Sequence, residues 1–310
     1  LDEFGDYDLE MGKLASGTDT SQMLEMVAAY ERWIEARTRV SESYSDLDRE
    51  QALEHMRLAR QCASRIRLGI DSLTDPGIGR AFRLMNVAMV EQRLAQDRAK
   101  GTDADVQRWR PFQLAFILMN LPALADPRHP EREIVDLLWF PTGGGKTEAY
   151  LGCIAFSILL RRLRREKDGG VSAIMRYTLR LLTRQQFERA SGLVCALEVI
   201  RRRELVEATP ISLGLWVGNS ATPNKVADAQ KILNDMASGV QPEGSTPVQL
   251  LRCPWCGSPL SHENYAVIRR ELTILCSSSS CDFADGLPLY VTDEDVYRVQ
   301  PSLVIGTVDK

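Results

Sequence analysis

Hydrophobic positions in the first third of the chain recur at helical spacing. Between residues 21 and 100, apolar side chains follow the three-to-four-residue period that places them on one face of a helix. The sequence "TDPG" at 74–77 interrupts this period, as expected for a break between two helices. A later apolar run has Pro111 near its start, a position that suits the first turn of a helix. The pattern predicts an acidic N-terminal segment over 1–20 and a helical region over 21–125.

The pattern then changes to short apolar runs that alternate with helical segments. The predicted strands are Ile134–Phe140, Val171–Tyr177, Ile211–Val217 and Ser302–Gly306. The predicted helices are Lys146–Arg165, Leu182–Val206 and Lys225–Ser238. Strands that alternate with helices indicate βαβ units, in which helices cover both faces of a parallel sheet. The sequence therefore predicts an α/β fold after the helical N-terminal region.

Three consecutive glycines separate the first predicted strand from the helix that follows it. Glycines let backbone N–H groups approach phosphate oxygens, and the N-terminus of a helix attracts anions. Lys146 is placed to reach the β- and γ-phosphates of ATP, and the Thr147 hydroxyl is suited to ligate Mg²⁺. Phe140 departs from the general P-loop pattern, which has glycine there, so a glycine-rich turn before a lysine is the alternative. The candidate nucleotide-binding residues here are Thr142, Gly143, Gly144, Gly145, Lys146, Thr147 and Glu148.

Four of the seven cysteines form two closely spaced pairs. These four are Cys253, Cys256, Cys276 and Cys281, with the spacing C-x2-C, nineteen residues, C-x4-C. Two pairs of thiolates at this separation can close a tetrahedral site around Zn²⁺, and four protein ligands leave no position open for catalysis. Two disulfides or four unrelated thiols are the alternatives, of which disulfides are disfavoured in the reducing cytoplasm that we expect here. We predict a structural zinc ribbon inserted over 250–290, suited to contact either DNA or a partner subunit.

The charge of the chain is distributed unevenly. The chain as a whole carries −4, but residues 160–205 hold twelve Lys or Arg and five acids, a local charge of +7. A local basic segment favours binding to a polyanion. Arginines near the end of a helix are also favourable with its dipole, so a solvated helix end is the alternative for 161–167. Arg176, Arg180 and Arg184 follow a predicted strand, at the sheet edge where α/β proteins bind ligands. No apolar run is long enough to span a membrane.

Several short motifs resemble those of superfamily 2 helicases. The motifs are "PTGGGKT" at 141–147 (the P-loop), "RLLTRQ" at 180–185 (motif Ia), "PSLVIGTVDK" at 301–310 (motif Ib) and "RPFQ" at 110–113 (a Q-motif). The resemblance implies a RecA-like lobe that binds ATP and Mg²⁺ and that contacts the DNA backbone. The implied contacts are Gln113 with adenine, and Arg180, Gln185 and Thr307 with DNA.

From about residue 80 to the end, the chain is similar to the DrmA family, the helicase subunits of DISARM bacterial anti-phage systems. That similarity implies a large ATP-dependent DNA translocase that works with a DrmB subunit. Helicases also need an acidic D-E-x-x motif and a second lobe, and we expect the acidic motif shortly after Lys310. The "TDEDVY" at 292–297 is a poor substitute, because no strand leads into it. We predict instead that it starts a helix, with Thr292 as the cap.

The predicted lobe therefore runs over 126–249, resumes at 291–310 after the zinc ribbon, and stops before the acidic motif. This segment alone is expected to be inactive. A motor that couples ATP to DNA movement and a nucleotide-gated DNA-binding scaffold both fit these motifs. A P-loop kinase or signalling NTPase is a third possibility, which the arginine-rich motif Ia and the cysteine segment disfavour.

Overall fold

The computed structural model divides into two compact units, which are described separately. Unit 1 comprises residues 1–87 and 106–156, and unit 2 comprises residues 88–105 and 157–310. The structure describes residues 7–17, 19–102, 105–141, 143–178, 180–308 and 310, and leaves out the side chains of 99–100 and 180–182. Two long helices, α4 (Pro76–Lys100) and α6 (Lys146–Arg164), contribute residues to both units.

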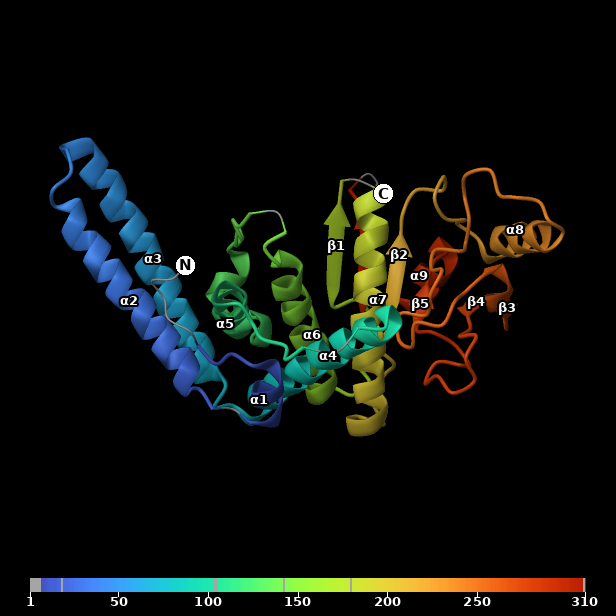
Figure 1. Ribbon diagram of the computed structural model, residues 1–310, viewed down its shortest axis with the longest axis horizontal. Coiled ribbons are helices and arrows are strands. Elements are labelled where there is room, and N and C mark those ends of the chain that lie inside the picture. Colours follow the sequence, from blue (N-terminus) through green and yellow to red (C-terminus); the bar gives the residue numbers. More distant parts are fainter. Residues whose placement is uncertain (1–6, 18, 103–104, 142, 179, 309) are drawn as a thin grey trace. The chain divides into compact units, whose positions relative to one another are not determined.

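Unit 1 is helical. Its further elements are α1 (Met11–Ser16), α2 (Ser21–Ser41), α3 (Asp46–Ser72), α5 (Pro111–Ala125) and a 3-10 turn at Pro130–Glu133. The helical pattern predicted over 21–100 and the helix predicted at Pro111 are confirmed. Helices α2 and α3 lie side by side as a hairpin (Figure 1). At Gly69, a Cβ atom would lie 1.9 Å from the Leu118 carbonyl oxygen, so the close packing of α3 on α5 requires glycine there.

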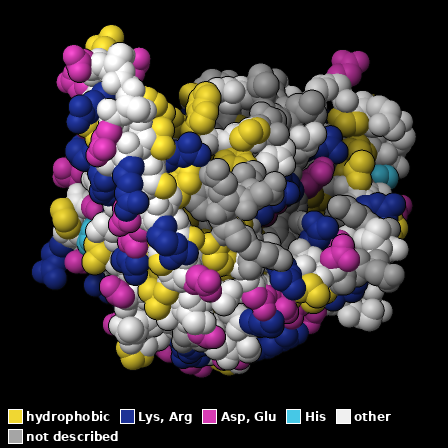
Figure 2. All heavy atoms as spheres, turned by 60° about the vertical axis from the view of Figure 1, so that its left-hand side comes forward, with side chains coloured by type: hydrophobic (Ala, Val, Ile, Leu, Met, Phe, Trp, Pro, Cys, Tyr) yellow, Lys and Arg dark blue, Asp and Glu magenta, His cyan; other side chains and the backbone are white. Residues whose placement is uncertain are grey.

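The outer surface of unit 1 is mixed in character. Figure 2, which brings the side of α2 and α3 forward, shows basic and acidic side chains interspersed with hydrophobic ones. Scattered apolar side chains of this kind are normal on soluble surfaces. Among the described helices of the chain, none combines the length and the hydrophobicity that crossing a bilayer requires.

The strand predicted at Ile134–Phe140 is wrong. This segment of unit 1 has no strand assignment and belongs to neither sheet of the described chain. The side chains of Asp136, Leu138 and Phe140 are half-buried, and Arg65 forms ion pairs with Asp136 at 2.6 Å and with Glu131 at 2.8 Å. The odd-numbered side chains point outward, with Leu137 82% and Trp139 88% exposed. The segment keeps the alternation of a strand, but a strand also needs a neighbour to bond with its backbone.

Unit 2 is built on a parallel sheet of four strands in the order β1-β6-β2-β5. The strands are β1 (Ala173–Tyr177), β2 (Leu213–Trp216), β5 (Leu289–Tyr290) and β6 (Leu303–Thr307). The arrows of β1 and β2 point the same way in Figure 1. Strands β1, β2 and β6 confirm three of the four predicted strands, and their inward side chains, such as Leu213, Leu215 and Ile305, are buried.

Helices and a small hairpin complete unit 2. They are α7 (Arg180–Glu204), α8 (Val226–Ala237), α9 (Asp293–Val299), a 3-10 turn (His262–Asn264), and the antiparallel strands β3 (Tyr265–Ile268) and β4 (Glu271–Ile274). Helices α6, α7 and α8 lie within two residues of their predicted bounds. Helix α7 contacts β1, β2 and β6, and therefore covers one face of the parallel sheet.

A buried arginine joins the start of the sheet to the end of α6. The Arg162 side chain is fully buried, and burial lowers the pKa of its guanidinium below the ordinary value. Its donors reach backbone oxygens of Thr209 at 2.9 Å and Asp168 at 2.5 Å, and they also reach Ser302 Oγ at 3.0 Å and the Pro210 carbonyl at 3.4 Å. Pro210 precedes β2 and Ser302 precedes β6, so this one side chain aligns the amino ends of two neighbouring strands.

We expect Arg162→Met to lower the free energy of unfolding by about 2–5 kcal/mol, because it leaves buried oxygen atoms without donors. Arg165→Met is a matched control, since Arg165 is exposed one residue past the end of the same helix, and its effect should stay within about 0.5 kcal/mol. Denaturant unfolding of both variants measures the difference. Equal midpoints would show that the Arg162 hydrogen bonds do not hold the sheet.

Candidate functional site

The glycine segment forms a tight turn that leads directly into a helix. Gly143 and Gly145 have φ values of +82° and +88°, in the left-handed region that glycine adopts without strain. The Gly144 amide donates to the Pro141 carbonyl at 3.1 Å, and α6 begins at Lys146. Thr142 lies outside the described residues. The glycine turn thus leads directly into the N-terminus of α6.

The first residues of α6 carry the predicted catalytic side chains. The Lys146 ammonium group donates to the carbonyl oxygens of Phe140 at 2.5 Å and Pro141 at 3.2 Å, so it folds back over the turn. Thr147 and Glu148 follow in the first turn of the helix, and both are half-buried. Lys146, Thr147 and the glycines thus lie together, as predicted.

The N-terminus of α5 holds this turn in place. Gln113 is buried, its Oε1 accepts from the Arg110 amide at 2.8 Å, and its Nε2 donates to the Gly145 carbonyl at 2.7 Å. The Arg110 guanidinium donates to the Gly144 carbonyl at 2.9 Å. A Cβ atom at Gly145 would lie 2.7 Å from Gln113 Nε2, so only glycine fits there. The predicted adenine contact of Gln113 is untested, but its amide positions the turn.

Sequence reasoning missed the role of Arg110. Its only signal was its place in the "RPFQ" motif, which does not reveal that the guanidinium grips the glycine turn. The same motif contributes Phe112, whose ring stacks on Phe140 with 3.9 Å between centroids and 13° between planes. Beside this stack lies a mainly apolar cavity of about 620 Å³, lined also by residues of α2 and α3. The turn is therefore fixed by hydrogen bonds and by aromatic packing.

The four predicted metal ligands come together in unit 2. Their sulfur atoms all lie within 4.8 Å of one another, with Cys253 and Cys281 at 3.9 Å and Cys256 and Cys276 at 3.4 Å. Tetrahedral zinc with four thiolates at ~2.3 Å requires sulfur separations of about 3.8 Å. All seven cysteines are free thiols, so the disulfide alternative is wrong. The donor set and the spacing fit a structural Zn²⁺ site, and His262 is not part of it.

Burial dominates the thiol chemistry of this cluster. It raises the pKa of Cys281 to about 12, and it raises the pKa of Cys253 further. Burial also acts on Cys256, but hydrogen bonds that it forms with Ser258, Cys276 and Cys253 together outweigh burial and lower the pKa of that thiol to about 7. A metal ion binds the thiolate form, so its charge would offset the cost of burying these sulfur atoms.

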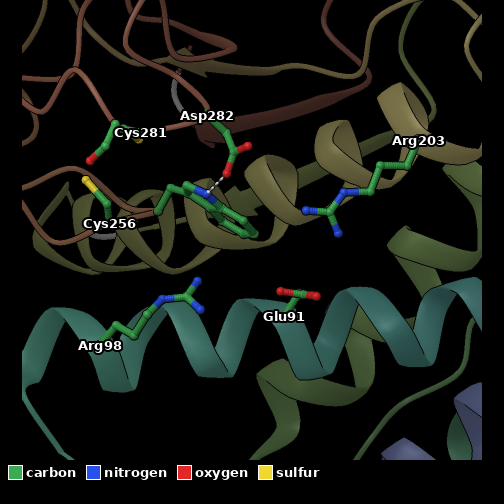
Figure 3. Close-up of a pocket in the computed structure, with 8 residues that line it drawn as sticks. Glu91, Arg98, Arg203, Cys256, Cys281 and Asp282 are labelled. Carbon is green, nitrogen blue, oxygen red and sulfur yellow. Dashed lines mark hydrogen bonds between the residues drawn. The ribbon is translucent and has the colours of Figure 1, made fainter.

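A small pocket adjoins the cysteine cluster, with a volume of about 240 Å³. Figure 3 shows Arg98 and Glu91 on α4 and Arg203 on α7 around it, with Cys256 and Cys281 across the pocket. Trp255 also lines the pocket: the indole donates to Asp282 at 2.7 Å, and the Arg98 guanidinium lies 5.5 Å from the ring centroid. The cysteine segment is thus packed onto α4 and α7.

The acids of "TDEDVY" have structural partners, as the prediction of a helix N-terminus implies. Thr292 caps α9, accepting from the Asp295 amide at 3.2 Å. The Asp295 carboxylate is fully buried and accepts from Thr292 Oγ1, from Arg298 and from the backbone amide of Leu272 in β4. Asp293 pairs with Lys310 at 2.6 Å. The prediction of a capped helix is confirmed, but the expectation that no strand leads into this segment is wrong, because β5 ends at Tyr290, two residues before Thr292.

The predicted DNA contacts lie in different environments. The Arg180 side chain lies outside the described residues, whereas Gln185 is exposed on the first turns of α7. Thr307 ends β6, and its hydroxyl is buried without a hydrogen-bond partner among the described residues. Glu188 pairs with Arg184 at 3.4 Å.

Much of the basic segment is engaged within unit 2. Arg161 pairs with Asp168 at 2.8 Å, and Arg201 and Arg202 both pair with the buried Glu198. These arginines stabilise loops and helix ends of the unit. The positive charge that is available to bind a polyanion is therefore smaller than the +7 of residues 160–205.

We expect one zinc ion per chain, and we expect Cys253→Ser to lower the zinc content, because three thiolates hold the metal less tightly. Cys62→Ser is the control, since Cys62 is a free thiol of unit 1. Metal analysis of the reduced proteins gives the zinc content, and far-UV circular dichroism should show that the helices persist. A reduced wild-type protein without metal would contradict the site.

Comparisons with known proteins give one curated relative for this chain. No protein-family model matches the chain. DISARM protein DrmA of Bacillus paralicheniformis is 38% identical to it over 285 residues, which cover 82% of this chain. The same alignment covers 26% of the relative, so the chain spans about a quarter of that protein. Across most of its length, the chain is therefore a DrmA-like protein.

Proposed function

We propose that the chain forms the first, nucleotide-binding part of an ATP-dependent DNA helicase or translocase of a DISARM anti-phage system. The observation that carries this proposal is the glycine turn, with its two left-handed glycines and a helix that starts at Lys146. The similarity to a DISARM protein supplies the defence context. A DrmB-like subunit is the proposed partner, and the cytoplasm is the proposed location.

The turn supports the phosphate-binding and Mg²⁺-binding part of this proposal. Its backbone amides and the α6 N-terminus would receive the phosphates, Lys146 would neutralise their charge, and the Thr147 hydroxyl would hold Mg²⁺. Bound Mg²⁺ supplies charge stabilisation to the phosphoryl group that is transferred. Because Gln113 and Arg110 bond to the carbonyls of Gly145 and Gly144, the amides of the turn are held in a fixed orientation. Such preorganisation avoids reordering the turn when nucleotide binds.

The proposed DNA contacts belong to unit 2. Helix α7 and strand β6 carry Arg180, Gln185 and Thr307 near the carboxyl ends of parallel strands, the edge at which open α/β sheets bind ligands. The RecA-like character of the complete lobe is part of this proposal. The zinc ribbon is proposed as a structural module, since its four ligands leave no open position.

In the full-length protein, we expect Lys146→Ala to weaken ATP binding strongly and to abolish ATP hydrolysis, because the charge next to the phosphates is lost. Lys167→Ala is the control, since Lys167 is exposed and pairs with the exposed Glu207. Binding of a fluorescent ATP analogue and release of phosphate give the two quantities.

Unchanged binding and turnover in Lys146→Ala would remove the phosphate-loop assignment. A wild-type protein that binds ATP and DNA, but that hydrolyses no ATP in the presence of DNA, would instead favour a nucleotide-gated scaffold.

A further inference from the structure

Three strands of the parallel sheet place an unusual row of residues across its carboxyl end. Arg176 of β1 and Trp216 of β2 are both register partners of Gly306 in β6. Side chains at paired positions of neighbouring strands lie on the same face of a sheet. Gly306 has no side chain, so the Arg176 guanidinium reaches across β6 and lies 5.5 Å from the centroid of the Trp216 indole. A Cβ atom at Gly306 would lie 2.8 Å from the Trp216 carbonyl oxygen.

Helix α9 extends this row by one more aromatic ring. The Tyr297 ring lies 6.2 Å from the Trp216 ring at an angle of 77°, and Trp216 Nε1 donates to the Tyr297 hydroxyl at 3.2 Å. This hydrogen bond uses the polar edge of the indole. Tyr297 is 63% exposed and Arg176 is also exposed, while Trp216 is half-buried between them. The row therefore offers aromatic surface and a cation to solvent.

Hydrogen bonds hold one end of the row, and apolar packing holds the other. The Arg176 guanidinium donates to the carbonyl oxygens of Val308 at 2.7 Å and Lys310 at 3.1 Å, which holds it over the indole. At the other end, Val296 of α9 packs on Gly214 of β2, where a Cβ atom would meet it at 3.0 Å. The two aromatic rings are therefore held in place before any ligand binds.

The acids near the row are occupied by other groups. Asp293 pairs with Lys310, Glu294 accepts from the Val226 amide at 2.9 Å, and Asp295 is buried against β4. Arg176 is the charged group that lies over the Trp216 ring. A ligand that brings a flat ring and a negative charge would match the row.

We propose that Arg176, Trp216 and Tyr297 form a stacking platform for an unpaired base of single-stranded DNA. An exposed base stacks on aromatic side chains, and a nearby arginine meets the phosphate next to it. Bases inside a duplex are already stacked on each other, so the platform selects unpaired DNA. The proposal rests on the proposed DNA-translocating function and adds to it a preference for single strands.

The test compares two DNA probes on the full-length protein. One is a fluorescent oligonucleotide of twenty thymidines, and the other is a strand of the same length made of abasic sites, which keeps the phosphates but has no bases. At one fixed salt concentration, we expect the wild-type protein to bind the thymidine strand more tightly. Tyr297→Leu should weaken binding of the thymidine strand by roughly 5- to 150-fold, the range that 1–3 kcal/mol of stacking per base corresponds to. Binding of the abasic strand should hardly change.

Tyr297→Phe is the matched control, because it keeps the ring and removes only the hydroxyl, so it should retain most of the affinity. Arg176→Gln should weaken binding of both strands alike and should lower the slope of log K against log salt by about one, because one phosphate contact is lost. Trp216→Leu should act as Tyr297→Leu does. If Trp216→Leu impairs folding, Tyr297→Leu still provides the test, because Tyr297 is exposed.

Two results would overturn the platform: equal wild-type affinity for the thymidine and abasic strands, or an unchanged thymidine affinity in Tyr297→Leu. Either result in a protein that binds DNA leaves the proposed function intact. A wild-type protein that binds neither strand nor duplex DNA would instead refute the DNA-binding part of the proposed function, and the platform with it. A lower melting temperature of Tyr297→Leu with unchanged DNA affinity would assign the row to protein packing.

Discussion

Unit 2 depends on one buried cation. Parallel strands carry no turns between neighbours, so something else has to align their amino ends, and Arg162 does this with a single guanidinium that bonds to the residues before β2 and β6. Four neutral oxygens receive the hydrogen bonds of this guanidinium. The resulting strand register pairs Arg176 and Trp216 with Gly306. Alignment of the strands at their amino ends therefore also determines which residues are neighbours at their carboxyl ends.

The periodicity of the sequence predicted the elements well where the apolar runs find partners in the fold. Helices α7 and α8 and strands β1, β2 and β6 pack within unit 2, α6 contributes to both units, and their patterns predicted their bounds to within two residues. The segment 134–140 has the same kind of apolar run. Its outward side chains, including Trp139, could be buried only by another segment, and the pattern of 134–140 does not predict such a segment. An apolar run shows that a strand would be stable if it were paired, and pairing is a property of two segments.

The candidate sites also differ in how much of them the sequence could predict. The glycine turn and the four cysteines are contiguous or regularly spaced motifs, and their chemistry follows from residue type and spacing. Gln113 and Arg110 lie more than thirty residues before the turn that they hold. Their role becomes visible only when the start of α5 is placed beside that turn. The Arg176–Trp216 contact needs the register of three strands, which no linear pattern encodes.

Asp295 ties the cysteine segment to α9, so this segment cannot be removed from unit 2 as an independent insertion could be. Its buried carboxylate receives the backbone amide of Leu272 in β4, and Thr292 and Arg298 complete its shell. Excising the cysteine segment by protein engineering would remove that amide and would leave the Asp295 carboxylate with one donor fewer beside Thr292 and Arg298. The segment and the start of α9 would thus have to be transplanted or deleted as one module, with Asp295 replaced at the same time. Grafting the segment onto another sheet would require an equivalent of this carboxylate.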